Sequence, residues 1–201
     1  MRRCLLSLFL LFILTAAASA QFGSASQNTP GVQLRGHNFG DLYAAQKTLL
    51  SNYCRLDFEG ARLQAAGWNR FKPYTSIRTN PEFSRVVVVT RFDIETPEQP
   101  TETLYASYKV VGFYDESDGY STVSASERVT FKVQEQKGSL LVTEVTPGTP
   151  HVSPRGAIAW MNLRLADTKI TDLERAHLQD AVTQLNKLAA PRQATKATPG
   201  A

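Results

Sequence analysis

The heptapeptide ERVTFKV, residues 127–133, places a carboxylate on a strand face that is otherwise apolar. Alternate residues of a β-strand point to opposite faces of the sheet. Glu127 therefore shares its face with Val123, Ala125, Val129, Phe131 and Val133. A buried carboxylate without a partner is costly, so it acquires either a partner or a raised pKa. Glu127 is thus the first candidate for chemistry, either as a neutral acid in a cavity or as one half of a structural pair with Arg55, Arg70 or a tyrosine.

Other polar and aromatic side chains are candidates for the same cavity. Asp57 lies beside Arg55 near the end of a predicted helix, where capping or surface pairing is its commoner role. Asp57 and His151 are the nearest candidates for a base close to Glu127. Aromatic side chains are typical of small-ligand pockets, although most of them are core residues in a domain of this size. The aromatic candidates are Trp68, Tyr74, Tyr105, Tyr108 and Trp160.

The sequence indicates no metal site and no cofactor. Its three histidines, His37, His151 and His177, are far apart, and no C-x-x-C motif accompanies them. His177 is expected to be a half-buried structural histidine on the last helix. No G-x-S-x-G elbow, phosphate-binding loop or dinucleotide-binding fingerprint is present.

Residues 1–20 predict export. Two arginines precede an apolar run from Leu5 to Leu14, and the segment ends in Ala18-Ser19-Ala20, which is typical of a secretory signal peptide. The run is short for a membrane span, although a retained anchor is the alternative. After cleavage the protein is expected to be secreted or periplasmic, with no stable membrane insertion. Cys54 is then the only cysteine left, so no internal disulfide forms, and a buried thiol is favoured over an intermolecular one.

The net charge does not indicate a nucleic-acid partner. Arg2, Arg3, Arg192 and Lys196 lie in terminal segments that contain no acids, and they account for the whole formal excess of +4. Residues 21–190 are therefore electrically balanced, whereas phosphate binding needs a clustered excess of Lys and Arg.

We expect a single domain at residues 37–190, between a flexible leader at 21–36 and a disordered tail at 191–201. Apolar residues recur at helical spacing from Leu42 to Leu63. Gly60 should mark a break or a change of direction in that helix. Further helical patterns follow the strands, one over 155–167 and one that opens with the capping box of Thr171 and Glu174.

Period-two patterns predict an α+β fold in which the first helix packs on a curved antiparallel sheet. Turn sequences join the predicted strands into a meander of four. In the first of these, Val86 and Val88 lie on the inner face, and Val87 and Val89 lie on the outer face. An exposed apolar outer face favours a homodimer through the sheet. The predicted strands are 85–95, 101–114, 120–133 and 138–147.

Three segments carry a resemblance to a known family: NYCRLDFEGARL, YASYKVVGFY and ERVTFKVQEQKGSLLVTEV. Together they resemble the nuclear transport factor 2-like superfamily, the α+β cone that includes ketosteroid isomerase and scytalone dehydratase. The resemblance covers about residues 38–146 and implies a cone, to which the C-terminal helices are an addition. Fold alone does not fix function.

By resemblance to ketosteroid isomerase, Tyr53 and Glu127 would form a donor pair that stabilises an oxyanion. That isomerase also requires a carboxylate base after its first helices. The corresponding segment here, GWNRFKPYTSIRTNP, contains no Asp or Glu, which argues against proton abstraction by this route.

Three functions remain open at this point. The first is a non-catalytic domain that holds a small apolar molecule or a partner segment, with Tyr53, Trp68, Tyr108 and Glu127 as ligand-binding residues. The second is an isomerase- or dehydratase-like enzyme whose catalytic candidates are Tyr53, Glu127 and Asp57. The third is a structural or dimerisation module with a filled cone.

Overall fold

The computed structural model describes residues 32–33, 39–95, 97, 99 and 101–189. The predicted signal peptide at 1–20 and the predicted tail at 191–201 lie outside the described residues. Of the predicted leader at 21–36, only residues 32–33 are described. Val32 and Gln33 form a short strand, β1, that pairs with Leu140 and Ser139.

A curled sheet in the order β1-β5-β4-β3-β2-β6 forms the body of the molecule. Its four long strands are antiparallel neighbours, as the period-two patterns predict. The predicted number of strands was wrong, because a two-residue strand extends each edge and is too short to show any period. The strands are β1 (Val32–Gln33), β2 (Arg85–Glu95), β3 (Thr103–Asp115), β4 (Gly119–Gln136), β5 (Ser139–Thr146) and β6 (His151–Val152).

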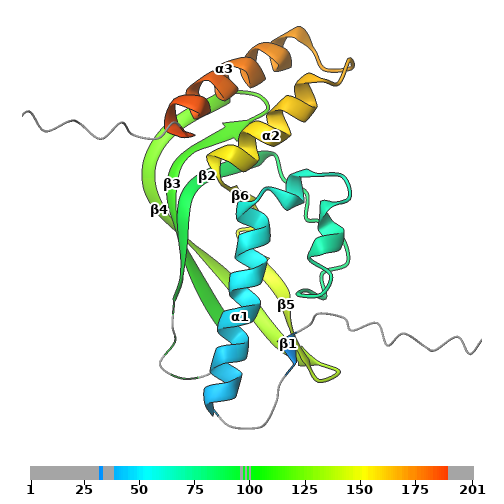
Figure 1. Cartoon of the computed structure of the whole chain (residues 1–201), viewed down its shortest axis with the longest axis vertical. Coiled ribbons are helices and arrows are strands. Elements are labelled where there is room, and N and C mark those ends of the chain that lie inside the picture. The colour runs from blue at the N-terminus through cyan, green and yellow to red at the C-terminus, as the bar shows by residue number, and fades with distance from the viewer. Residues whose placement is uncertain (1–31, 34–38, 96, 98, 100, 190–201) are drawn as a thin grey trace, which may run out of the picture.

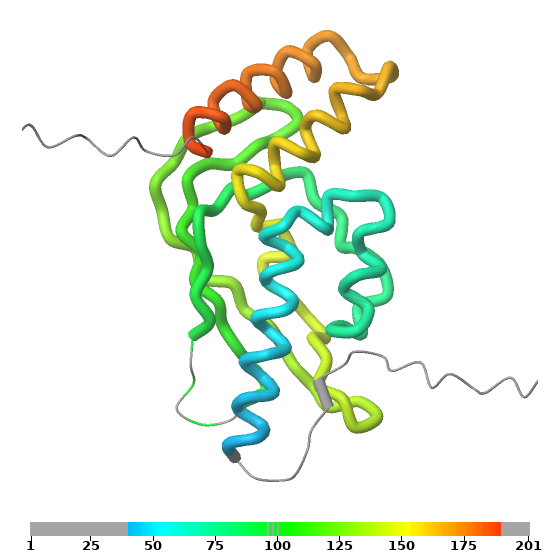
Figure 2. The backbone as a smooth tube through the Cα atoms, in the orientation of Figure 1, coloured from blue at the N-terminus to red at the C-terminus, as the bar shows by residue number. Residues whose placement is uncertain are grey.

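Three helices complete the α+β fold in the described part of the chain: α1 (Phe39–Phe58), α2 (Pro154–Leu165) and α3 (Asp172–Ala189). The sheet curls around α1, while α2 and α3 lie together at one end of the molecule (Figure 1). Two short 3₁₀ turns, Ala61–Leu63 and Gly67–Arg70, follow α1. The chain then folds back beside α1 on its way to β2 (Figure 2).

Residues 86–89 of β2 are buried on both faces of the strand. Val87 and Val89 pack in the cluster that α1 forms with the sheet, whereas Val86 and Val88 pack in the cluster that contains α2 and α3. The prediction that Val87 and Val89 are exposed was therefore wrong, since they are only 6% and 0% exposed. Alternation assigns residues to opposite faces but does not reveal that a separate layer covers each face.

The hairpin between β4 and β5 follows from its turn residues. Lys137 and Gly138 both have positive φ, at 53° and 77°, which a two-residue type I′ turn requires. This turn sets Gln136 opposite Ser139. The register along β4 is thereby fixed.

A close approach of two glycines joins α1 to α2. Gly60 has φ 81° and follows the last residue of α1 by two positions, so the predicted break at Gly60 is confirmed. Residues with side chains avoid this left-handed conformation. Ser153 caps α2 by accepting a hydrogen bond from the N–H of Gly156, and its own N–H donates to the Phe58 carbonyl at 2.8 Å. The end of α1 is therefore held against the segment that contains β6.

Replacing Gly156 with alanine is expected to destabilise the fold by about 1–3 kcal/mol, as overpacking typically does. The added Cβ would lie 3.0 Å from the Glu59 carbonyl oxygen, which belongs to the backbone and cannot swing away. Urea denaturation measures the difference. The matched control is Gly148→Ala, whose Cβ would meet nothing closer than 3.7 Å. Equal midpoints for the two variants would contradict this account of the junction.

Candidate functional site

Glu127 lies on β4 at the edge of an open pocket of about 370 Å³. Its side chain is 33% exposed, so it is accessible rather than sealed in the core. No residue in the described part of α1 lines the pocket. The other lining residues are Arg85, Val87, Val110, Phe113, Val123, Ala125, Ser126 and Thr149.

The walls of this pocket are mainly apolar, and the cationic side chain among them is already engaged. The Arg85 guanidinium lies over the Phe113 ring, 4.5 Å from its centroid, and Arg85 Nε is 3.4 Å from Asp115 Oδ2. A bulge between Val110 and Gly112 allows Phe113 to join Val110 in the lining. Glu127 is the only carboxylate among the described residues that line the pocket.

The partner of Glu127 is His151, not the arginines or the tyrosine considered from the sequence. Nε2 of His151 lies 3.2 Å from Oε2 of Glu127, although the N–H direction is poorly aligned for a hydrogen bond. Arg55 and Arg70 both pair with Glu59 instead. The prediction that a histidine lies close to Glu127 in space is confirmed for His151.

Two neighbouring strands hold the His151 ring in place. β6 pairs in parallel with β2, which sets His151 beside Val87. The ring lies against that of Tyr108, with centroids 4.3 Å apart. Tyr108 is in turn the β3 residue opposite Glu127 in the ladder, so the sheet register brings these side chains together.

A backbone carbonyl orients the His151 ring. Nδ1 is 2.9 Å from the Thr149 carbonyl oxygen, which can only accept, so we assign the hydrogen to Nδ1. Nε2 is then the ring atom that faces Glu127.

Contact with His151 lowers the pKa of Glu127 below its ordinary value, and this outweighs the opposing effect of partial burial. The shift favours the carboxylate form of Glu127. A neutral acid of the kind that resemblance to ketosteroid isomerase implies would require the opposite shift. The physical cause of the difference is the buried imidazole beside Glu127.

Behind His151 lies a second, fully buried ion pair. Asp57 Oδ2 accepts a hydrogen bond from the His151 backbone N–H at 3.1 Å and lies 3.7 Å from Nη1 of Arg62. Arg62 also donates to Asn80 and to the Gly148 carbonyl. Burial raises the pKa of the Asp57 carboxyl, with Arg62 opposing that shift. The expected capping or surface role of Asp57 was wrong, because the side chain points into the molecule.

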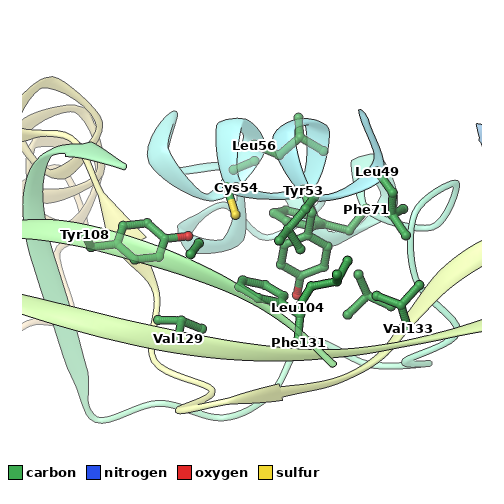
Figure 3. Close-up of a cluster of buried hydrophobic side chains, with 14 of the residues drawn as sticks. Leu49, Tyr53, Cys54, Leu56, Phe71, Leu104, Tyr108, Val129, Phe131 and Val133 are labelled. Atoms are coloured by element: carbon green, nitrogen blue, oxygen red, sulfur yellow. The ribbon is translucent and has the colours of Figure 1, made fainter. Parts of the chain in front are cut away.

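The remaining predicted site residues are part of the packed core. Tyr53, Trp68 and Tyr108 are 1%, 7% and 2% exposed, and none of them lines the Glu127 pocket. Tyr53 stands between α1 and the sheet, near Phe131, and the Tyr108 hydroxyl points towards Cys54 (Figure 3). The structure therefore brings Glu127 to His151 and Tyr108, and leaves Tyr53 among aromatic neighbours.

Sequence reasoning missed one contributor to this site, Arg62, and the burial of another, His151. His151 was considered as a base, but the turn residues around it gave no sign that it is buried. Arg62 was not considered at all, although it lies among the predicted apolar positions and its side chain is fully buried. An arginine between Ala61 and Leu63 in such a stretch was the only available signal.

Two further properties concern only the described residues. No group of three or more His, Cys, Asp or Glu side chains among them could hold a metal ion. None of the helices they form has the length and apolar character needed to cross a membrane.

Comparison of the chain with models of protein families, with curated proteins and with solved structures found no match. The resemblance to the nuclear transport factor 2-like superfamily therefore stays a prediction.

Replacing Tyr53 with phenylalanine is expected to leave the free energy of unfolding unchanged, or to raise it by up to about 1 kcal/mol. The Tyr53 hydroxyl is buried with no hydrogen-bond partner among the described residues. The matched comparison is Tyr108→Phe, which removes a side-chain hydrogen bond to Cys54. This loss should lower the free energy of unfolding by about 0.5–1.5 kcal/mol. Urea denaturation measures the free energy of unfolding of both variants. A larger loss of stability in Tyr53→Phe than in Tyr108→Phe would show that the Tyr53 hydroxyl has a hydrogen-bond partner.

The contact between Glu127 and His151 has a consequence for stability in acid. Because the pKa of Glu127 is lowered in the fold, its contribution is present above the unfolded value of about 4.3 and is lost as the pH falls through the folded value. Thermal stability between pH 6 and pH 3 should therefore fall less steeply in Glu127→Gln than in the wild type. Glu135→Gln, at the far end of the same strand, is the control and should follow the wild type.

Proposed function

We propose that this protein is a binding domain whose pocket around Glu127 holds a small apolar molecule, or an apolar side chain of a partner segment, that carries a hydrogen-bond donor. The observation that carries the proposal is an accessible carboxylate in a pocket whose walls are mainly apolar. The proposal keeps the ligand class inferred from the sequence but replaces Tyr53, Trp68 and Tyr108 by the pocket residues as its contacts.

The two oxygens of Glu127 have different roles in this proposal. Oε2 faces His151, whereas Oε1 makes no hydrogen bond with any described residue and is free to accept one from a ligand. A carboxylate that is already oriented loses little freedom on binding, which favours affinity. Val87, Val110, Phe113 and Val123 would contact the apolar part of the ligand.

The packed interior supports binding at this pocket rather than deep inside the cone. α1, β3, β4 and β5 fill the hollow of the sheet with buried side chains, among them Tyr53, Phe71 and Phe131. A ligand of ordinary size would have to displace them, at a cost of several kcal/mol in packing. The open pocket beside Glu127 requires no such displacement.

The proposal also concerns where the protein acts and which superfamily it belongs to. The signal-like residues 1–20 support action outside the cytoplasm, in the periplasm or as a secreted protein. A helix held in a curled antiparallel sheet supports membership of the nuclear transport factor 2-like superfamily, with α2 and α3 as additions.

An acid–base enzyme is the second candidate, and the contact between Glu127 and His151 favours it. Glu127 would take a proton from an isomerase- or dehydratase-type substrate, while the buried His151 would position the carboxylate. A bound compound that is converted, rather than recovered unchanged, would distinguish the enzyme from the binding domain.

Ligand-observed NMR tests the proposal with apolar fragments that carry a hydroxyl or amine, each paired with its O- or N-methylated analogue. We expect the donor-bearing member of a pair to bind the wild type more tightly. Affinity should fall about tenfold or more in Glu127→Gln, as loss of a hydrogen bond to a charged group implies. The same spectra, followed over hours, reveal any conversion.

Two further variants make the result specific to this pocket. Ala125→Leu fills part of the pocket without changing Glu127 and should abolish binding, whereas Glu135→Gln should bind like the wild type. Absence of any binder, or binding that is indifferent to both pocket variants, would overturn the proposal and favour a structural module with a filled cone.

A further inference from the structure

One edge of the sheet is only partly covered. The two-residue strand β6 pairs with β2 at Val87 and Val88. From Val89 to Glu95, β2 pairs with β3 on one side, and no strand within the described part of the chain pairs with its other side. The backbone donors and acceptors of this stretch are therefore not engaged on that side by any strand that the structure describes.

Open strand edges readily pair with another strand, and charged residues are a common protection against this. The side chains of Arg91 and Asp93 are 73% and 71% exposed, with Nε of Arg91 3.6 Å from Oδ2 of Asp93. They lie two positions apart on one face of β2. An exposed pair of this kind adds little to the stability of a single chain, so it is available to form other contacts.

The charges on this edge are complementary to themselves. Phe92 is the midpoint of the open stretch from Val89 to Glu95. If a second copy pairs antiparallel about a two-fold axis through Phe92, Arg91 of each copy lies directly opposite Asp93 of the other. Opposite charges at facing positions stabilise a strand pair.

Other symmetric registers are disfavoured by the same residues. Centring the pair on Arg91 sets two arginines opposite each other, and centring it on Asp93 sets two aspartates opposite each other. Shifting the register by one residue would place inner-face side chains opposite outer-face ones. The register centred on Phe92 is the one that pairs both charges.

We propose that two copies of this chain form a two-fold symmetric dimer by antiparallel pairing of their β2 edges about Phe92. The interface is isologous, as in most homodimers, and the two sheets become continuous. It differs from the dimer through an apolar sheet face that the sequence suggested, because Val87 and Val89 are buried. The bulge between Val89 and Arg91 keeps the regular ladder short, so the dimer is expected to dissociate on dilution.

Charge reversal tests this register with the full chain. Arg91→Asp sets a new carboxylate opposite Asp93 of the other copy, and Asp93→Arg sets a new guanidinium opposite Arg91. Each variant alone should therefore raise the dimer dissociation constant about tenfold or more. Mixing the two variants restores opposite charges at every facing position and should give a heterodimer of wild-type affinity. Analytical ultracentrifugation over a range of concentrations measures the wild type, each variant and the mixture.

Hydrogen exchange supplies an independent readout. Amide protection in residues 89–95 should rise with protein concentration in the wild type and in the mixture, and not in either variant alone. Lys132→Glu, a charge reversal on β4, is the control and should dimerise like the wild type. A wild type that stays monomeric at every concentration, or a dimer that neither reversal weakens, would overturn the proposal.

Discussion

The hydrogen bond from the His151 backbone N–H to Asp57 Oδ2 is the interaction on which the site depends. It joins residues 94 positions apart and ties the last turn of α1 to β6. β6 pairs with β2. Ser153, the residue that follows β6, is the N-cap of α2. One buried bond therefore links the helix in the cone, the edge of the sheet and the C-terminal helices, and it fixes the ring that faces Glu127.

A row of polar groups lies behind the pocket. Arg62, Asp57 and His151 are all buried, whereas Glu127 at the end of the row is accessible. Buried ion pairs contribute little net stability, because desolvation offsets their attraction, but removing one partner leaves an uncompensated charge. The value of this arrangement lies in orientation. Each group restricts the position of the next, so the carboxylate at the pocket keeps one geometry without a ligand.

The sequence predicts local features of this molecule better than contacts between distant residues. The face of Glu127 follows from alternation within β4, and the end of α1 follows from a single glycine at position 60. The contact with His151 depends on a parallel pairing of two residues in β6, which has no sequence period. Arg62 is buried only because Asp57, Asn80 and Gly148 surround it. Burial of Val87 likewise requires knowledge of which helices cover each face.

The end of α1 determines which residues the helix presents to the rest of the site. Aromatic and aliphatic side chains fill the hollow along the helix and pack around Tyr53. The helix ends at Phe58 because Gly60 takes a left-handed conformation next to Gly156. Asp57, in the last turn before this end, accepts the hydrogen bond from the His151 backbone, and the His151 ring faces Glu127. A backbone constraint outside the pocket thus helps to set the ring beside the carboxylate of Glu127.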